Sequence, residues 1–349
     1  MTTAQKKGVL DTGFKENITY VTNYIQSTST YFLTNVSESH ESFLEEIIFG
    51  LTRIPKYIHP KFFYNKKGSQ LFDKICELPE YYLTRVETKI LEKIRNQFSK
   101  YLQGIDRLVE LGSGSSIKTR AILNILTKTQ KEVVYFPIDI SDIMESIAEQ
   151  IEKEYNNLHV IPIKASYEKG LELSRKLVPG KKLFIFLGSS IGNFTTEHRR
   201  IFLKKIYDSM NKDELLLIGF DLVKDPIILN AAYNDVQGIT AQFNLNVLER
   251  INENAGANFD LSKFEHVAFF NPNESRIEMY LKSKISQKVL LSKTNQMISF
   301  EKNEAVLTEY SYKFTISDIK RIAKVIPFKM LKIWKDENSY FALALFSKP

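Results

Sequence analysis

Two glycines follow an acidic residue in the segment 107–120, which reads RLVELGSGSSIKTR. The apolar residues before Glu110 predict a strand, and the apolar spacing from Thr119 to Leu126 predicts a helix. Gly112 and Gly114 permit backbone angles closed to other residues and let a ligand approach the main chain. The helix N-terminus behind them offers free N–H groups. The pattern therefore indicates a site for a nucleotide-like ligand.

This turn differs from two common phosphate sites. The pyrophosphate motif GxGxxG needs a third glycine, and a P-loop ends in Gly-Lys followed by Ser or Thr. Asp139 instead stands at the end of the next predicted strand, where a carboxylate can hold a ribose diol. The combination resembles S-adenosylmethionine-dependent methyltransferases. The alternative is a plain strand–helix turn of another α/β protein.

An alternation of strands and helices is expected to position these residues. Strands are predicted at 107–111, 133–138, 158–163, 182–188 and 214–220, with helices between them. This order predicts a parallel, doubly wound sheet, in which ligands bind beyond the carboxyl ends of the strands. The glycine turn, Asp139 and residues 188–193 all follow strands, so we expect them to converge.

The remaining segments predict a second unit and a closing hairpin. Helical spacing appears at 38–56 and 84–102, and the stretch between them is dense in aromatic residues. Residues 221–314 break the α/β pattern and look like an insertion. The sequence predicts a helix at 231–252, extended runs at 266–271 and 276–283, a helix at 318–326 and strands at 328–334 and 340–346.

Composition describes an ordinary globular chain. It is 43% hydrophobic and 26% charged, with a net charge of +7. Adjacent basic residues occur only as isolated pairs, and the basic residues are interleaved with acidic ones. We therefore expect a solvated surface and no nucleic-acid partner. Cys76 is the single cysteine, no apolar run could span a bilayer, and no signal peptide is recognisable. These features predict a cytoplasmic protein.

Over residues 42–347 the chain resembles the histidine Nα-methyltransferase family of ergothioneine biosynthesis. Separate blocks carry the resemblance in order: 63–85, 109–120, 186–194, 221–252, 276–281 and 307–314. The resemblance implies an α/β, Rossmann-like class I methyltransferase sheet with a second, inserted substrate-binding domain. It divides the chain into a flexible arm at 1–37, a substrate-binding domain at 38–86 and 221–314, and an S-adenosylmethionine-binding domain at 87–220 and 315–349.

The resemblance also assigns site residues. Donor contacts are implied for Gly112, Lys118, Asp139, Ser166 and Tyr167. The family carries an acidic residue near the adenine where this chain reads Ala-Ser-Tyr-Glu at 165–168. The amino-acid site is implied at Tyr64, Phe72, Tyr81, Asn193, Tyr233, Met279, Glu309 and Ser311.

The chemistry of these residue types supports a histidine site. Glu309 and Ser311 are two apart, so on a strand both side chains face the same way. The carboxylate can accept from one imidazole N–H, and the hydroxyl can serve the other nitrogen. Asn193 and Tyr233 can hydrogen-bond an α-carboxylate. Each side chain taken singly also has an ordinary structural role open to it; Asn193, for example, could cap the helix that begins near Thr195.

The expected activity is trimethylation of the α-amine of L-histidine to hercynine by S-adenosylmethionine. Neither a metal nor a dedicated general base is expected, and the protein is expected to be a monomer. The same reaction on tryptophan or tyrosine stays open. So do an RNA-binding or RNA-modifying protein and a donor-binding regulator without activity.

Overall fold

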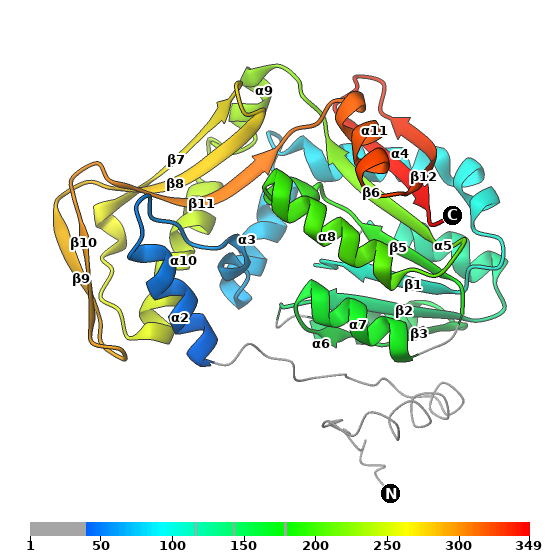
Figure 1. Ribbon diagram of the computed structural model, residues 1–349, viewed down its shortest axis with the longest axis horizontal. Coiled ribbons are helices and arrows are strands. Elements are labelled where there is room, and N and C mark those ends of the chain that lie inside the picture. The colour runs from blue at the N-terminus through cyan, green and yellow to red at the C-terminus, as the bar shows by residue number, and fades with distance from the viewer. Residues whose placement is uncertain (1–39, 115, 117, 142–143, 178–179) are drawn as a thin grey trace, which may run out of the picture.

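The computed structural model describes residues 40–114, 116, 118–141, 144–177 and 180–349 (Figure 1). The arm predicted at 1–37 lies outside the described residues. The chain forms a central sheet flanked by helices and, beside it, a second group of strands and helices (Figure 1). In the described part of the chain, no helix is both long enough and apolar enough to cross a membrane.

The central sheet has the predicted doubly wound arrangement. Its strand order is β12-β13-β6-β5-β1-β2-β3, with the short β4 also paired to β2. Strands β1 to β6 pair in parallel, and β13 and β12 add antiparallel to β6 as a closing hairpin. The strands are β1 (Arg107–Leu111), β2 (Val133–Asp139), β3 (Leu158–Val160), β4 (Ile163–Lys164), β5 (Lys182–Phe186), β6 (Leu215–Asp221), β12 (Lys329–Lys335) and β13 (Phe341–Ser347).

Helices cover both faces of this sheet. Because side chains alternate along a strand, Leu108 of β1 joins one hydrophobic cluster and Val109 joins the other. The first cluster includes α4, α5 and α6, and the second includes α7, α8 and α11. The helices are α4 (Tyr82–Phe98), α5 (Thr119–Thr129), α6 (Met144–Glu154), α7 (Tyr167–Leu177), α8 (Thr196–Ser209) and α11 (Ile316–Val325), with 3-10 turns η2 (Ser99–Tyr101) and η3 (Ser190–Asn193).

The second group is built on an antiparallel sheet of order β11-β8-β7. Helix α10 packs against α3 and against β7 and β8. The strands are β7 (Phe264–Asn271), β8 (Arg276–Ser283) and β11 (Ala305–Tyr312), with a separate hairpin of β9 (Gln287–Leu291) and β10 (Gln296–Phe300). The helices are α2 (His40–Leu51), α3 (Lys66–Glu77), α9 (Pro226–Ala231) and α10 (Ile239–Ala255), with 3-10 turns η1 (Pro60–Phe63) and η4 (Leu261–Lys263).

The insertion leaves and rejoins the central sheet at one place. The Phe314 N–H donates to the Asp221 carbonyl at 2.9 Å, and the Val223 N–H donates to the Phe314 carbonyl at 3.0 Å. Leu222 and Phe314 pair as a parallel bridge. Residues that are far apart in the sequence are therefore held together directly beyond the end of β6.

Two predicted elements were wrong in detail. The helix predicted at 231–252 begins only at Ile239, as α10, because the Asp235 carboxylate accepts the N–H groups of Ile239 and Thr240 at 2.8 Å. Residue 231 is instead the last residue of the short α9. Gly238 precedes that helix with φ +68°. The strand predicted at 158–163 is divided into β3 and β4, which pair with different parts of β2.

Candidate active site

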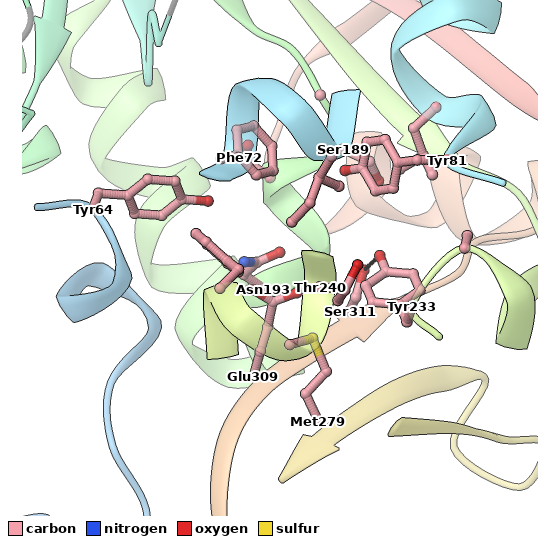
Figure 2. Close-up of a pocket in the computed structure, with 16 residues that line it drawn as sticks. Tyr64, Phe72, Tyr81, Ser189, Asn193, Tyr233, Thr240, Met279, Glu309 and Ser311 are labelled. Atoms are coloured by element: carbon pink, nitrogen blue, oxygen red, sulfur yellow. Dashed lines mark hydrogen bonds between the residues drawn. The ribbon is translucent and has the colours of Figure 1, made fainter. Parts of the chain in front are cut away.

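A cavity lies between the end of β5, helices α3 and α10, and the second sheet (Figure 2). It encloses about 530 Å³ of empty space, part of it open to solvent. All eight residues predicted for the amino-acid site line it, although they come from segments spread over most of the chain. The lining residues are Tyr64, Phe72, Ile75, Tyr81, Leu83, Gly188, Ser189, Ser190, Asn193, Ala232, Tyr233, Thr240, Phe243, Met279, Glu309 and Ser311.

Strand β11 contributes the two predicted ring contacts. Glu309 and Ser311 both line the cavity, as their spacing of two predicts (Figure 2). Burial raises the pKa of Glu309 to about 7, although Lys313 and a hydrogen bond with Asn193 act in the opposite direction. Near neutral pH the carboxyl is therefore poised between its neutral and ionised forms.

Asn193 reaches Glu309 because η3 lies close to β11. A Cβ atom on Gly192 would stand 2.8 Å from the Tyr312 carbonyl oxygen, so only glycine allows this approach. The alternative role of Asn193 as a helix cap is not seen. Thr195 caps α8 instead, its hydroxyl accepting the His198 N–H.

A buried polar network underlies Ser311. The Tyr233 hydroxyl donates to Ser311 Oγ at 2.8 Å, and Lys313 Nζ donates to Ser311 Oγ at 2.8 Å and to the Tyr233 hydroxyl at 3.1 Å. Lys313 also pairs with Asp221 Oδ2 at 2.9 Å, and neither side chain is exposed. Tyr233 was expected to donate a hydrogen bond to the α-carboxylate of the substrate. Because its hydroxyl has a single proton, it could do so only by giving up its hydrogen bond to Ser311.

Aromatic rings form another part of the wall. Phe72 packs edge-on against Tyr64 at 5.7 Å and against Tyr81 at 6.3 Å between ring centroids. Tyr81 in turn meets Tyr233 at 6.4 Å. Burial raises the pKa of all three tyrosines, so they stay neutral and present both ring faces and hydroxyls. Met279 of β8 lines the cavity on the side of Glu309, its partner on β11 (Figure 2).

The glycine turn lies at the carboxyl end of β1, as predicted. Gly112 has φ +73° and Gly114 has φ +47°, both in the region that favours glycine. A Cβ atom on Gly114 would meet nothing within 4 Å, so its backbone borders open space. Asp139, at the end of β2, accepts the N–H groups of Gly114 at 3.0 Å and Ser141 at 2.9 Å. These residues form a cradle of the kind that fits a nucleoside with a ribose diol.

Tyr167 and Ser166 lie across from this turn at the start of α7. A Cβ atom on Gly112 would stand 2.8 Å from the Tyr167 hydroxyl, so that hydroxyl covers the turn. The Tyr167 ring packs edge-on against Phe186 at 5.6 Å. Ser166 Oγ accepts the Lys169 N–H at 3.5 Å in the first turn of α7. Tyr167 thus lies against the glycine turn of the expected donor site, and Ser166 directly precedes Tyr167 in the chain.

Lys118 links the turn to the cavity. Its Nζ pairs with Glu87 Oε2 of α4 at 2.8 Å, and Glu87 is fully buried. Glu87 also accepts the Gly188 N–H, at 2.8 Å to Oε2. Because Gly188 lines the cavity, one carboxylate holds together a predicted donor residue and the cavity wall.

The acid before the glycines has a structural task. Glu110 is buried and accepts from the Thr119 hydroxyl at 2.7 Å and from the Tyr135 hydroxyl. Burial raises its pKa to about 7, against the lowering effect of these hydrogen bonds. Glu110 therefore ties β1 to the start of α5 and to β2 behind the turn.

Several site residues were not predicted, although the sequence carries signals for some of them. Lys313 continues the spacing of Glu309 and Ser311 by two more residues, and Asp221 directly follows the strand predicted at 214–220. Glu87, Thr240 and Phe243 carry no comparable signal, because helical spacing alone does not show which side chains border a cavity. Among the described residues, no group of three or more His, Cys, Asp or Glu side chains could hold a metal ion.

Comparison with known proteins agrees with this geometry. Residues 43–348 match the model of a family described as "Histidine-specific methyltransferase, SAM-dependent". The chain is 38% identical to a histidine N-alpha-methyltransferase of Mycobacterium tuberculosis, over 88% of this chain and 96% of that protein. It is equally similar, at 38%, to the Mycolicibacterium smegmatis protein of that name, over 87% of this chain and 94% of the relative.

A more distant relative is a longer protein. Ergothioneine biosynthesis protein 1 of Neurospora crassa is 27% identical over 82% of this chain, which covers 32% of that protein. The family match spans nearly the whole chain, and the fold, the glycine cradle and the polar cavity all agree with it. The chain therefore belongs to the histidine-specific methyltransferases that use S-adenosylmethionine as the methyl donor.

Proposed function

We propose that the protein transfers three methyl groups to the α-amine of L-histidine and forms the betaine hercynine, the first step of ergothioneine synthesis. The observation that carries this proposal is that all eight residues expected at the amino-acid site line one cavity, with a carboxylate and a hydroxyl on the same side of β11. The similarity of the chain to histidine N-alpha-methyltransferases supports the same substrate.

The imidazole ring is assigned to Glu309 and Ser311. A carboxylate accepts one ring N–H, and a hydroxyl can donate to the other nitrogen. A site built to hydrogen-bond a polar group strongly rejects analogues that lack it, because its own buried groups are then left unpaired. This chemistry favours histidine over tryptophan or tyrosine.

The α-amine is assigned to the side of the cavity near Gly188. The contact of Gly188 with Glu87, and through it with Lys118, makes this wall continuous with the donor turn. Gly112, Lys118, Asp139, Ser166 and Tyr167 would hold S-adenosylmethionine, which supplies an electrophilic methyl group. The protein then needs chiefly to hold a neutral amine in line with that methyl group.

Repeated methylation turns the amine into a quaternary ammonium. The faces of Tyr64, Tyr81 and Tyr233 can accommodate such a cation by cation–π contact. We also propose that segments 38–86 and 221–314 form the substrate-binding domain and that 87–220 and 315–349 form the donor-binding domain. The pairing of Asp221 with Phe314 at the junction supports these boundaries.

The test is turnover of free amino acids. The purified protein is incubated with S-adenosylmethionine and each of L-histidine, L-tryptophan and L-tyrosine, and product masses are read. The proposal expects a histidine product heavier by three methyl groups. Methylation of tryptophan or tyrosine but not of histidine would overturn the assignment of Glu309 and Ser311. The absence of any methylated amino acid would overturn the proposed reaction.

A further inference from the structure

Lys313 is a buried cation beside the cavity, and the proposed reaction assigns it no role. Its side chain is fully buried, and its ammonium group contacts Asp221 at 2.9 Å, Ser311 at 2.8 Å and Tyr233 at 3.1 Å. A lysine ammonium has three protons and no acceptor, so these contacts use its whole donor capacity. Burial lowers the pKa of Lys313, but Asp221 and Tyr233 more than offset this, so the group stays charged.

The contacts of Lys313 fix the hydrogen-bonding role of Ser311. The Ser311 oxygen has two lone pairs, and it accepts from Lys313 Nζ and from the Tyr233 hydroxyl, both at 2.8 Å. Only the Ser311 proton remains. Because Ser311 lines the cavity, that proton is what it offers to a bound ligand.

Glu309 has the opposite role on the same strand. Its ionised carboxylate only accepts hydrogen bonds, and Asn193 already donates to it. A ligand that satisfies both side chains must present a donor to Glu309 and an acceptor to Ser311. A neutral imidazole has one of each, an imidazolium has two donors, and an indole has a donor but no acceptor.

We propose that Lys313 is a specificity-determining positioning residue, which holds Ser311 as a donor and thereby makes the cavity select a neutral imidazole in a single tautomer. This inference rests on the proposed function, because it describes how the same cavity reads the histidine ring. Its two consequences are that protonated histidine is rejected and that the rejection depends on Lys313.

The charged groups around the ring act in opposite directions. Glu309 attracts an imidazolium, whereas Lys313 repels it. The charge of Asp221 is already balanced by Lys313 and Lys224. The remaining titratable groups that face the cavity are Tyr64, Tyr81 and Tyr233, which burial keeps neutral.

The experiment compares L-histidine with 2-fluoro-L-histidine, whose ring stays neutral at pH values where histidine is protonated. Calorimetry gives both affinities at about pH 8 and about pH 5.5, with the protein saturated with S-adenosylhomocysteine. Any titration of Glu309 affects both ligands, so their affinity ratio isolates protonation of the ligand ring. For the unmodified protein we expect the histidine-to-fluorohistidine ratio to fall about tenfold, since a ring with a pKa near 6.5 is then mostly charged.

The matched variants are Lys313→Met and Lys224→Met. Both remove a cation from Asp221, but the contacts of Lys224 are with Asp221, Tyr82 and the Leu222 carbonyl. In Lys313→Met the ratio should fall less than about threefold, because Ser311 regains a lone pair that can accept from an imidazolium. In Lys224→Met it should fall as in the unmodified protein.

An unchanged ratio in the unmodified protein would overturn the inference, and so would an equally steep fall in Lys313→Met. If Lys313→Met does not fold, Ser311→Ala gives the same test, since without Ser311 no hydrogen-bond donor demands an acceptor from the ring, and the opposing charges of Glu309 and Lys313 largely cancel. A steep fall in Ser311→Ala would then contradict the proposal. Failure of both ligands to bind at either pH would instead refute the proposed function itself.

Discussion

At the scale of the residue, the proposed recognition of histidine depends on two side chains of one strand that have opposite hydrogen-bonding roles. Glu309 accepts and Ser311 donates, although both face the same cavity. Their spacing in the sequence predicts the shared direction. The donor role of Ser311 depends on Lys313, Tyr233 and Asp221, and this dependence appears only when the buried network is seen.

Replacing Glu309 by Gln should weaken histidine binding by about 10- to 100-fold. The change removes a charged acceptor, and hydrogen bonds to charged groups contribute about 1.5–3 kcal/mol. Titration calorimetry with L-histidine measures the effect, and binding of S-adenosylhomocysteine should be unchanged. The control is Glu304→Gln, which lies just before the same strand and pairs with Lys56. Equal affinities in the two variants would contradict the assignment.

Histidine recognition should weaken as the pH falls through about 7. Burial raises the pKa of Glu309 to about that value, and the ring N–H needs the ionised carboxylate. The affinity for 2-fluoro-L-histidine, whose own ring does not titrate there, should fall toward tenfold per pH unit below about 7. In Glu309→Gln this dependence should be lost, so a persisting slope would show that another group titrates.

The raised pKa of Glu309 also determines the direction in which the stability of the folded protein changes with pH. A carboxyl whose pKa is raised in the folded state contributes stability that is present below its unfolded pKa and is lost as the pH rises through about 7. Ionising Glu309 in the ligand-free protein therefore costs stability. A ligand that donates a hydrogen bond to the carboxylate offsets that cost.

At the scale of the element, the strand–turn–helix unit was predicted correctly from its glycines and apolar spacing. The role of Glu110 was not visible, because its partners Thr119 and Tyr135 come from the next helix and strand. The start of α10 was predicted too early, at residue 231. The apolar spacing extends back through residues 231–238, and the decisive contacts are those of Asp235 with the backbone of α10.

Gly112→Ala should reduce both stability and the affinity for S-adenosylhomocysteine. The backbone has φ +73°, and the new Cβ would stand 2.8 Å from the Tyr167 hydroxyl. The matched control is Gly104→Ala, which has φ +71° and nothing within 4 Å. The control should lose only about 1–2 kcal/mol of unfolding free energy for its backbone angle.

Chemical unfolding measures the loss of stability in the two glycine variants, and calorimetry measures their affinity for S-adenosylhomocysteine. Adding Tyr167→Phe to Gly112→Ala should restore part of the lost stability, because it removes the clashing hydroxyl and leaves the backbone strain. Equal losses for the two single variants, with no loss of donor affinity in Gly112→Ala, would contradict this account of the turn.

At the scale of the whole molecule, Asp221 links the central sheet to the second group of strands and helices. It lies at the end of β6 and pairs with Lys313, which follows β11, and with Lys224, and it accepts the Tyr82 hydroxyl of α4 at 2.7 Å. Burial raises the pKa of Asp221, but the two lysines more than offset this and hold it below its usual range. The sequence predicted the fold and the insertion, but not this junction, because Tyr82 lies 139 residues before Asp221 and Lys313 lies 92 residues after it.

Asp221→Ala should lower the free energy of unfolding by about 3–5 kcal/mol, because it leaves two buried cations without a carboxylate. Urea unfolding measures this loss. The control is Asp208→Ala, whose exposed carboxylate pairs with Lys204 on a helix surface and should contribute less than about 1 kcal/mol. A similarly small loss at Asp221 would show that the network does not stabilise the junction.

The most direct measurement is a crystal structure of the protein with L-histidine and S-adenosylhomocysteine bound together. The account predicts one ring nitrogen at hydrogen-bond distance from Glu309, the other at that distance from Ser311, and the α-amine on the side of Gly188, facing the donor sulfur. A histidine ring bound away from Glu309 and Ser311, or an α-amine directed away from the sulfur, would contradict it.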